Sequence, residues 1–273
     1  MTDTTAAAAE VPRPVLNTSI AHIARVYDYW LGGKDNFAVD RQAAEAMMQA
    51  TPHVVEGVRG NRAFLARTVR YLAGPCGIRQ FLDIGTGLPA ADNTHELALA
   101  QAPQSRVVYV DNDPIVLAHA RALLTGNANA FTDYVDADVR DTTNVLSLAA
   151  RTLDFGQPVA VMMVAVLHCI PDEDDPAGIV ARLMAAVPPG SYLVVSHPSS
   201  DIDVDGVRRG ASQLNKLMHT KLTFRSHPQV AQFFDGLDVV APGVVRIPDW
   251  RPDSELDRAN PATVWGGVAR KPG

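Results

Sequence analysis

Two short motifs bring glycine and carboxylate groups together in a way that suits binding of a small charged ligand. The glycine turn Gly85-Thr86-Gly87 directly follows an apolar run. Glycines let the backbone approach a ligand, and the helix expected after the turn would present free N–H groups. The second motif runs from Val107 to Asp111 and is an apolar run that ends in a carboxylate. A glycine turn alone is equally typical of a tight connection, so the second motif decides its interpretation.

The residues around the turn separate two classes of ribose-containing cofactor. A carboxylate at the end of the second strand of a parallel sheet, here Asp111, can accept hydrogen bonds from both ribose hydroxyls of NAD or of an adenosine cofactor. The dinucleotide fingerprint requires glycine or alanine three residues after the second glycine, and this chain has Ala90 preceded by Pro89. Asp83 would repel a pyrophosphate but suits a cationic sulfonium cofactor with an ammonium group. An NAD-dependent oxidoreductase remains an alternative, although the chain offers no clear Tyr-x-x-x-Lys pair at the expected place.

A third acidic motif follows the next apolar run, from Val135 to Asp141. Asp138 can accept a hydrogen from the exocyclic amine of adenine, and the backbone N–H of Val139 can reach a ring nitrogen. Either Asp138 or Asp141 can instead cap the next helix, and we assign Asp138 to adenine and Asp141 to the cap. The expected cofactor contacts also include three residues near neighbouring strand ends, namely Thr86, Asn112 and Ala165.

The order of these motifs resembles that of the cofactor motifs in class I S-adenosylmethionine-dependent methyltransferases. A closer resemblance, to one bacterial family of S-adenosyl methyltransferases, covers nearly the whole chain from Asn17. It rests on the segment from Arg25 to Phe37, on Leu88-Pro89 and on the segment from His168 to Pro176. The resemblance implies S-adenosyl-L-methionine as cofactor and a Rossmann-like α/β fold. Its doubly wound sheet would be mainly parallel with a C-terminal antiparallel strand. The resemblance implies no particular substrate.

The residues after the fourth strand, where the acceptor lies in this fold, indicate a small-molecule acceptor rather than nucleic acid. The Asn/Asp-Pro-Pro-Tyr/Phe pattern of enzymes that methylate exocyclic base nitrogens is absent. Methylation of cytosine C5 needs a Pro-Cys nucleophile after this strand, but Pro75-Cys76 precedes the first strand. His168 is a candidate general base because imidazole titrates near neutrality, and His197 is a second candidate. Alternatively, His168 only packs beside the cofactor. We expect O- or N-methylation that relies mainly on alignment and desolvation.

The N-terminal segment contains many polar and aromatic side chains around Gly32-Gly33. It could close over the cofactor as a lid, with Arg25 or Lys34 pairing with the methionine carboxylate. Further side chains assigned to the lid and the substrate are Tyr27, Tyr29 and Asn36. Alternatively, the segment is an ordinary amphipathic helix whose apolar residues lie in the core and whose charges are solvated.

The patterns around these motifs predict the elements that position them. Short apolar runs alternate with helical stretches after Gly74-Pro75, which is typical of a buried parallel sheet with βαβ connections. The predicted strands are 80–84, 106–110, 132–136, 159–165, 191–196, 237–240 and 263–269. The predicted helices are 20–31, 40–50, 56–72, 90–100, 114–125, 142–151, 176–187, 204–221 and 228–234. The predicted division is a disordered tail (1–16), a helical lid or substrate segment (17–75) and a Rossmann-like cofactor-binding domain (76–273).

Composition narrows the class of protein further. The 273 residues carry a formal net charge of −6, which argues against nucleic acid as a partner, because nonspecific affinity comes from clustered Lys and Arg. Two cysteines without metal-ligand spacing indicate no zinc, and the acidic run 172–175 suits a helix cap better than Mg²⁺, so no metal is expected. No apolar run is long enough to span a membrane, so we expect a cytoplasmic protein. A regulatory protein that binds the cofactor without turnover remains an alternative, and the oligomeric state is not predicted.

Overall fold

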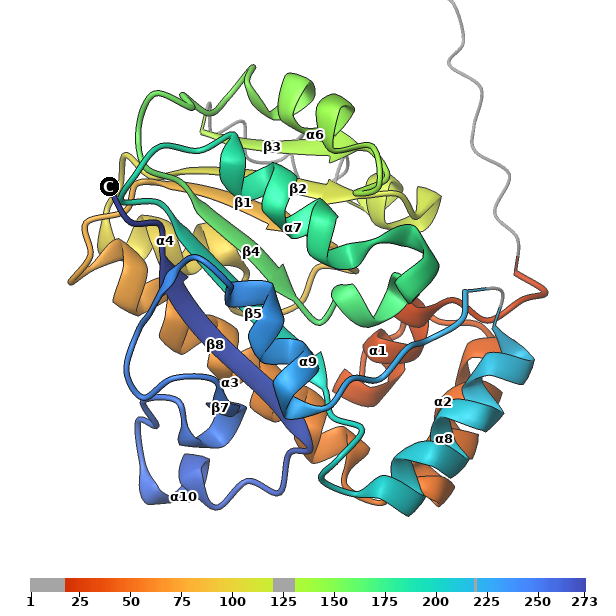
Figure 1. Cartoon of the computed structure of the whole chain (residues 1–273). Helices are drawn as coiled ribbons and strands as arrows, with labels where there is room; N and C mark the ends of the chain where they lie inside the picture. Colours follow the sequence, from red (N-terminus) through yellow and green to blue (C-terminus); the bar gives the residue numbers. More distant parts are fainter. Residues whose placement is uncertain (1–17, 120–130, 219) are drawn as a thin grey trace, which may run out of the picture.

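The computed structural model describes residues 18–119, 131–218 and 220–273. Over these residues the chain forms an eight-stranded sheet in the order β3-β2-β1-β4-β5-β8-β6, with β7 pairing with β8 beside that path (Figure 1). The strands are β1 Gln80–Ile84, β2 Arg106–Asp111, β3 Thr132–Asp136, β4 Ala160–Val164, β5 Tyr192–Pro198, β6 Asp238–Val239, β7 Val245–Arg246 and β8 Val264–Arg270.

The order and direction of the strands create a crevice in which a ligand can lie. β1 to β5 run parallel, whereas β8 pairs antiparallel with β5, β6 and β7. The chain passes from β1 through β2 to β3 and then returns to β4 on the other side of β1. At such a switch point the connections leave the strands toward opposite faces, which opens a crevice at the carboxyl ends. The predicted doubly wound sheet with a C-terminal antiparallel strand is confirmed.

Helices cover both faces of the sheet and bury its apolar side chains. α3 (Val54–Ala73) and α4 (Thr94–Gln101) share one buried cluster with one face. α6 (Thr142–Ala149) and α7 (Pro176–Ala185) share a second cluster with the other face. Because the sheet is covered on both sides, β1 is buried along its whole length. The shorter elements are α9 His227–Ala231, α10 Glu255–Arg258, η1 Leu167–Cys169, η2 Asp172–Asp174, η3 Gln232–Phe234 and η4 Ile247–Asp249.

A third group of helices lies beside the carboxyl ends of the parallel strands (Figure 1). It consists of α1 (Ile23–Leu31), α2 (Ala38–Ala50) and α8 (Val204–Leu217), which share an apolar cluster that includes Trp30 and Leu214. The sequence placed α3 in the same N-terminal segment, but α3 packs on the sheet. Its place beside α2 is taken by α8, which comes from the C-terminal half of the chain.

Several elements differ from the sequence prediction, among them α4, α1 and β7. α4 starts later than predicted, because Asn93 and Glu96 form a capping box that fixes its first turn. α1 also starts later, at Ile23, because the chain just before it pairs with Met218 as an isolated bridge. β7 lies in the Pro-rich loop, where the sequence predicted no strand. The helix predicted at 114–125 is helical over 114–119, and its end lies outside the described residues, as does the tail predicted at 1–16.

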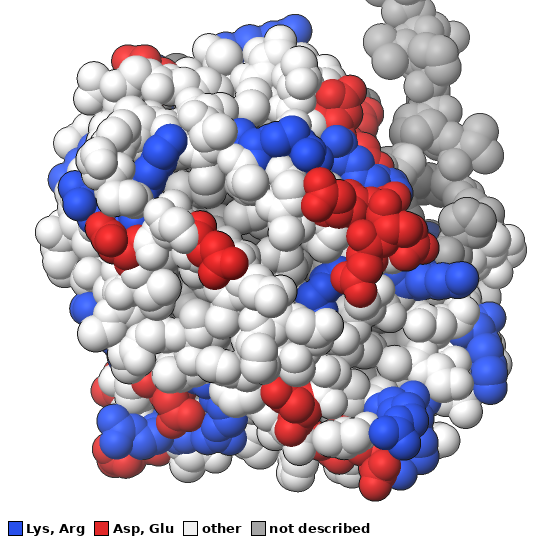
Figure 2. All heavy atoms as spheres, in the orientation of Figure 1, with Lys and Arg blue, Asp and Glu red and all other residues white. Residues whose placement is uncertain are grey.

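The charge distribution on the surface and the lengths of the helices concern two classes of partner, nucleic acid and membrane. On the face shown in Figure 2, basic side chains are interspersed with acidic ones instead of forming one continuous stripe. A continuous basic stripe is the usual footprint of a site that binds a phosphate backbone. Among the described residues, none of the helices has both the length and the apolar character needed to cross a bilayer.

Candidate functional site

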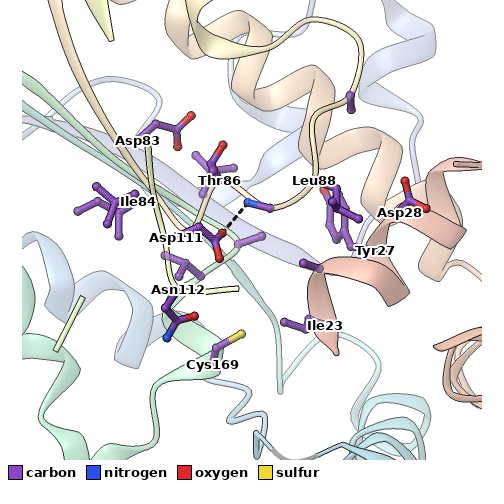
Figure 3. A pocket seen from close by; sticks show the side chains of 18 of the residues that line it. Ile23, Tyr27, Asp28, Asp83, Ile84, Thr86, Leu88, Asp111, Asn112 and Cys169 are labelled. Carbon is purple, nitrogen blue, oxygen red and sulfur yellow. Dashed lines mark hydrogen bonds between the residues drawn. The ribbon is translucent and has the colours of Figure 1, made fainter. Parts of the chain in front are cut away.

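A cavity of about 410 Å³ lies at the carboxyl ends of β1, β2 and β4 and is bordered by α1 (Figure 3). This volume falls within the range of small-molecule sites. Eleven of the residues predicted from the sequence line it, namely Tyr27, Asp83, Gly85, Thr86, Gly87, Asp111, Asn112, Asp138, Val139, Ala165 and His168. The crevice at the switch point of the sheet is therefore the place where the predicted motifs meet.

The glycine turn is tied to the end of β2. Gly85 and Gly87 have φ angles of 73° and 66°, and a Cβ on Gly85 would overlap the side chain of Val166. The N–H of Gly87 donates to Asp111 Oδ2 at 2.9 Å (Figure 3). The N–H of Asp113 donates to Asp111 Oδ1 at 2.9 Å. Each carboxylate oxygen has a second lone pair, so Asp111 can still accept two ribose hydroxyls. Burial raises the pKa of Asp111, and these two backbone bonds oppose that rise.

Asp83 lies buried beneath the glycine turn. The hydroxyl of Thr94, at the start of α4, donates to Asp83 Oδ2 at 2.6 Å. Burial raises the pKa of Asp83 to about 6, although the Thr94 hydrogen bond and the charge of Arg62 act in the opposite direction. A buried carboxylate with this raised pKa would be stabilised by a cation in the cavity. The turn is therefore suited to a positively charged ligand group.

After β3, Asp141 caps a helix and Asp138 lines the cavity. The side chain of Asp141 accepts the N–H of Asn144 and caps α6, which confirms its assignment as a cap. Asp138 lines the cavity, but Arg140 donates to it from its backbone and its guanidinium. These bonds hold the pKa of Asp138 below its usual range. The Asp138 carboxylate is thus ionised and can accept hydrogen bonds, and Asn112 Nδ2 lies 3.3 Å from it.

A chain of hydrogen bonds joins α1 to the end of β4. Tyr27 donates to the carbonyl of Val58 at 3.3 Å and accepts from Asn61 Nδ2 at 3.0 Å. Asn61 Oδ1 accepts from the Ser196 hydroxyl at 2.6 Å, and Ser196 Oγ accepts from the N–H of Ala165 at 3.0 Å. Ala165 is a non-glycine residue with a positive φ of 56°, an unfavourable conformation that these bonds hold in place. The position of α1 is therefore coupled to the cavity wall at β4.

Asp28 holds together the N-terminal segment around Gly32-Gly33. Its Oδ2 accepts from the N–H of Asp35 at 3.0 Å and from Asn36 Nδ2 at 2.8 Å, while a Cβ on Gly33 would overlap its Oδ1. Gly32 ends α1 with a φ of 84°. Asp28 itself lines the cavity, and Asn36 acts behind it by holding the carboxylate. The two glycines and Asn36 therefore shape one wall of the site.

The structure places the other predicted residues away from the cavity wall. Arg25, expected at the methionine carboxylate, is buried against Asp40, with Nε 3.1 Å from Oδ1. The Tyr29 hydroxyl donates to Glu45 at 3.1 Å. Lys34, the other cation expected at the carboxylate, is exposed and is not among the lining residues. Instead, the cavity is lined by Arg62 of α3, which belongs to none of the predicted motifs.

The two predicted histidine bases are both held uncharged. Arg225 Nη1 donates to His197 Nε2 at 3.0 Å, and His197 Nδ1 donates to the carbonyl of Pro198 at 2.8 Å. Burial, followed by the proximity of His168, lowers the pKa of His197 to about 3. Burial and the charge of Arg225 lower the pKa of His168 to about 4. His197 does not line the cavity, and neither histidine has the proton affinity that a general base at neutral pH needs.

Residues 9–272 match the model of a family described as S-adenosyl methyltransferase. The chain belongs to this family. The predicted family, fold and cofactor, S-adenosyl-L-methionine, are thereby confirmed. The fold of this S-adenosyl methyltransferase also resembles that of an O-methyltransferase family protein from Burkholderia thailandensis, with a TM-score of 0.52 at 14% identity over 86% of this chain and 60% of that one.

Two solved structures resemble this S-adenosyl methyltransferase over nearly their whole length. A DUF574 family protein from Streptomyces avermitilis gives a TM-score of 0.89 at 42% identity, covering 93% of this chain and 99% of that one. A Thermobifida fusca protein, provisionally described as a methyltransferase, gives a TM-score of 0.87 at 38% identity, covering 93% of this chain and 96% of that one. Among curated proteins, trans-aconitate 2-methyltransferase of Acidovorax sp. is 26% identical over 182 residues, or 63% of this chain. The chain spans only 59% of the length of that relative.

Proposed function

We propose that this S-adenosyl methyltransferase transfers a methyl group from S-adenosyl-L-methionine to an oxygen or nitrogen of a small molecule. The observation that carries the proposal is the cavity in which the glycine turn and Asp111 meet the end of β4 and the helix α1. In class I methyltransferases the cofactor and the acceptor meet at the same switch point of the sheet. Membership of the family over residues 9–272 supports the same class of reaction.

The residues present suit the adenosine part of the cofactor. We assign the ribose hydroxyls to Asp111, whose oxygens each keep a free lone pair beside their backbone donors. We assign adenine to the pocket between Asn112 and Val139, with Asp138 accepting from the exocyclic amine. Asp138 can do this only on the lone pairs that Arg140 leaves available, so this contact adds selectivity rather than much affinity.

The residues at the other end of the cavity suit the methionine part. We assign the ammonium group to the side of the cavity that Asp83 and Asp28 line, because a cation there offsets the buried charge of Asp83. We assign the methionine carboxylate to Arg62, whose Nη2 already bridges the carbonyls of residues 91 and 92 at 2.8 Å. Arg62 thus takes the role that was predicted for Arg25 or Lys34.

In methyl transfer the protein mainly has to align the acceptor with the cofactor and exclude water. The bound cofactor supplies a methyl group already activated by a sulfonium, so no covalent intermediate with the protein is required. α1 covers the cavity with Ile23, Tyr27 and Leu31, and the chain of hydrogen bonds through Asn61 fixes Tyr27 against the end of β4. The acceptor would lie between α1 and Ala165, where the walls are fixed.

Calorimetric titration with S-adenosyl-L-methionine, S-adenosyl-L-homocysteine and NAD tests the cofactor. We expect the first two to bind and NAD to give no heat; binding of NAD alone would refute the proposal. Transfer is then tested with tritium-labelled cofactor and a small-molecule extract, together with trans-aconitate, the compound in the name of the curated relative. Binding without any labelled product would make the chain a cofactor-binding protein without turnover.

A further inference from the structure

A histidine and an aspartate that no sequence motif indicated form a pair at the edge of the same cavity. His22, the residue just before α1, lines the cavity, and its Nδ1 lies 2.7 Å from Oδ2 of Asp113. Asp113 is buried, and its Oδ1 accepts the N–H of Ile115 at 2.9 Å. Burial raises the pKa of Asp113, but the contact with His22, the N–H of Ile115 and the charge of Arg25 together leave this pKa below its usual value. The pair therefore joins an imidazole to an ionised carboxylate.

The distances within the pair fix the tautomer of His22. An Nδ1 to carboxylate distance of 2.7 Å requires a proton on Nδ1. The N–H of Ala24 also approaches Nδ1, but at 3.4 Å this contact is too long to compete. Nε2 of neutral His22 therefore carries a lone pair. The side chain is 35% exposed, so the imidazole is in contact with solvent. The charged groups nearest this end of α1 are Asp113, Asp111, Asp40 and Arg25.

His168, His197, Cys169 and Tyr27 are poor proton acceptors at neutral pH. His168 and His197 are held uncharged by burial and by Arg225. Burial raises the pKa of the Cys169 thiol to about 12 and also raises the pKa of Tyr27, so neither supplies an anion at neutral pH. Within the described part of the wall, His22 is the imidazole that contacts a carboxylate.

Resting on the function proposed above, we propose that His22 is the general base of the methyl transfer, that Asp113 positions it, and that the acceptor is an uncharged molecule with a phenolic hydroxyl. Phenols have a pKa of about 10 and keep their proton at neutral pH, so a phenol needs a base there, whereas a carboxylate is already ionised and does not. Apolar residues of the cavity wall suit an uncharged ring, namely Ile23, Ala24, Leu31, Leu65 and Ile170.

The step balances in atoms and charge. The phenolic oxygen forms a bond to the methyl carbon as the bond from that carbon to sulfur breaks, and the electron pair of the broken bond stays on sulfur. The phenolic proton moves to Nε2 of His22, and Asp113 stabilises the imidazolium that forms. The imidazolium then releases the proton to solvent through its exposed edge.

The test compares para-substituted phenols of increasing acidity, each with saturating tritium-labelled cofactor. His22→Asn keeps a residue type that caps helices well. We expect about 10²- to 10³-fold slower transfer to phenols that stay protonated. The loss should be less than about tenfold for 4-nitrophenol, which is largely ionised at mildly alkaline pH and needs no base. Asp113→Asn should show the same trend with a smaller loss, and added imidazole should partly restore the rate of His22→Ala.

The matched control is His119→Asn. His119 also pairs with an aspartate, Asp35, at 3.7 Å, but it is not among the residues that line the cavity, and its loss should leave transfer unchanged. An equal loss for all phenols in His22→Asn, with no imidazole rescue, would show a structural role and overturn the base assignment. Transfer to other acceptors but to no phenol would overturn the acceptor class. Failure to bind the cofactor at all would instead contradict the function proposed above.

Discussion

Replacing Asp111 by alanine should weaken binding of S-adenosyl-L-homocysteine by about 2–3 kcal/mol, or roughly 30- to 150-fold. Two effects add to this magnitude. The ribose loses a charged hydrogen-bond acceptor, and such a bond contributes about 1.5–3 kcal/mol. The N–H groups of Gly87 and Asp113 lose their acceptor too, so the glycine turn is less well held before the ligand arrives. The loss should therefore lie toward the upper end of the range for a single bond.

Isothermal titration calorimetry at fixed pH and salt measures this loss, and circular dichroism checks that the variant is folded. Asp136→Ala is the matched control, because Asp136 ends β3 directly opposite Asp111, is exposed and is not among the lining residues. We expect its affinity to stay within about twofold of the unmodified chain, as for an ordinary surface substitution. A folded Asp111→Ala variant that binds as tightly as the unmodified chain would refute the ribose assignment. Equal weakening in both variants would point to long-range charge instead.

Three further variants test the site and its supports. Asp83→Asn should stabilise the cofactor-free protein: burial raises the pKa of Asp83 from 3.8 to about 6, which opposes folding by about 3 kcal/mol above pH 6 and by nothing well below pH 4. Urea unfolding at both pH values would therefore show a gain only at the higher one. Arg25→Met leaves buried Asp40 unpaired and should cost about 3–5 kcal/mol of stability, whereas Lys34→Ala should change neither thermal stability nor cofactor affinity. Gly33→Ala should lower the melting temperature through overlap with Asp28, and combining it with Asp28→Ala should remove most of that loss if the overlap is the cause.

The cofactor end of the site could be predicted because it depends on strand ends alone. Parallel strands in one sheet bring their carboxyl ends to one edge, so Asp83, Asp111 and Asp138 converge once the strands are located. No side-chain packing has to be known for this inference. The pattern of apolar runs and helices predicted a parallel sheet, whereas the doubly wound arrangement was implied by the family resemblance.

The lid and the acceptor end depend on contacts that spacing along the chain does not reveal. Arg25 and Arg62 both lie on N-terminal helices, and only the packing of α1 on α2 turns the first toward Asp40 while α3 brings the second to the cavity. Burial, together with the charge of Arg225, which is remote in sequence, lowers the pKa of His168. His22 gains its role only from Asp113, which belongs to the segment after β2. A sequence shows the residue types, but these partners come from the tertiary fold.

The packing of α8 against α2 has a consequence for how the protein is made. α1 and α2 are synthesised before the sheet, but the apolar face that they share with Leu214 of α8 stays uncovered until β1 to β5 have been synthesised. The two buried clusters of the sheet also take up residues that follow α8, among them Phe233 and Trp250, so they too are completed after α8. The wall that α1 contributes to the cavity is thus completed late. A nascent chain should acquire its ligand-binding competence only after α8 has been synthesised, and truncation after β5 should remove it entirely.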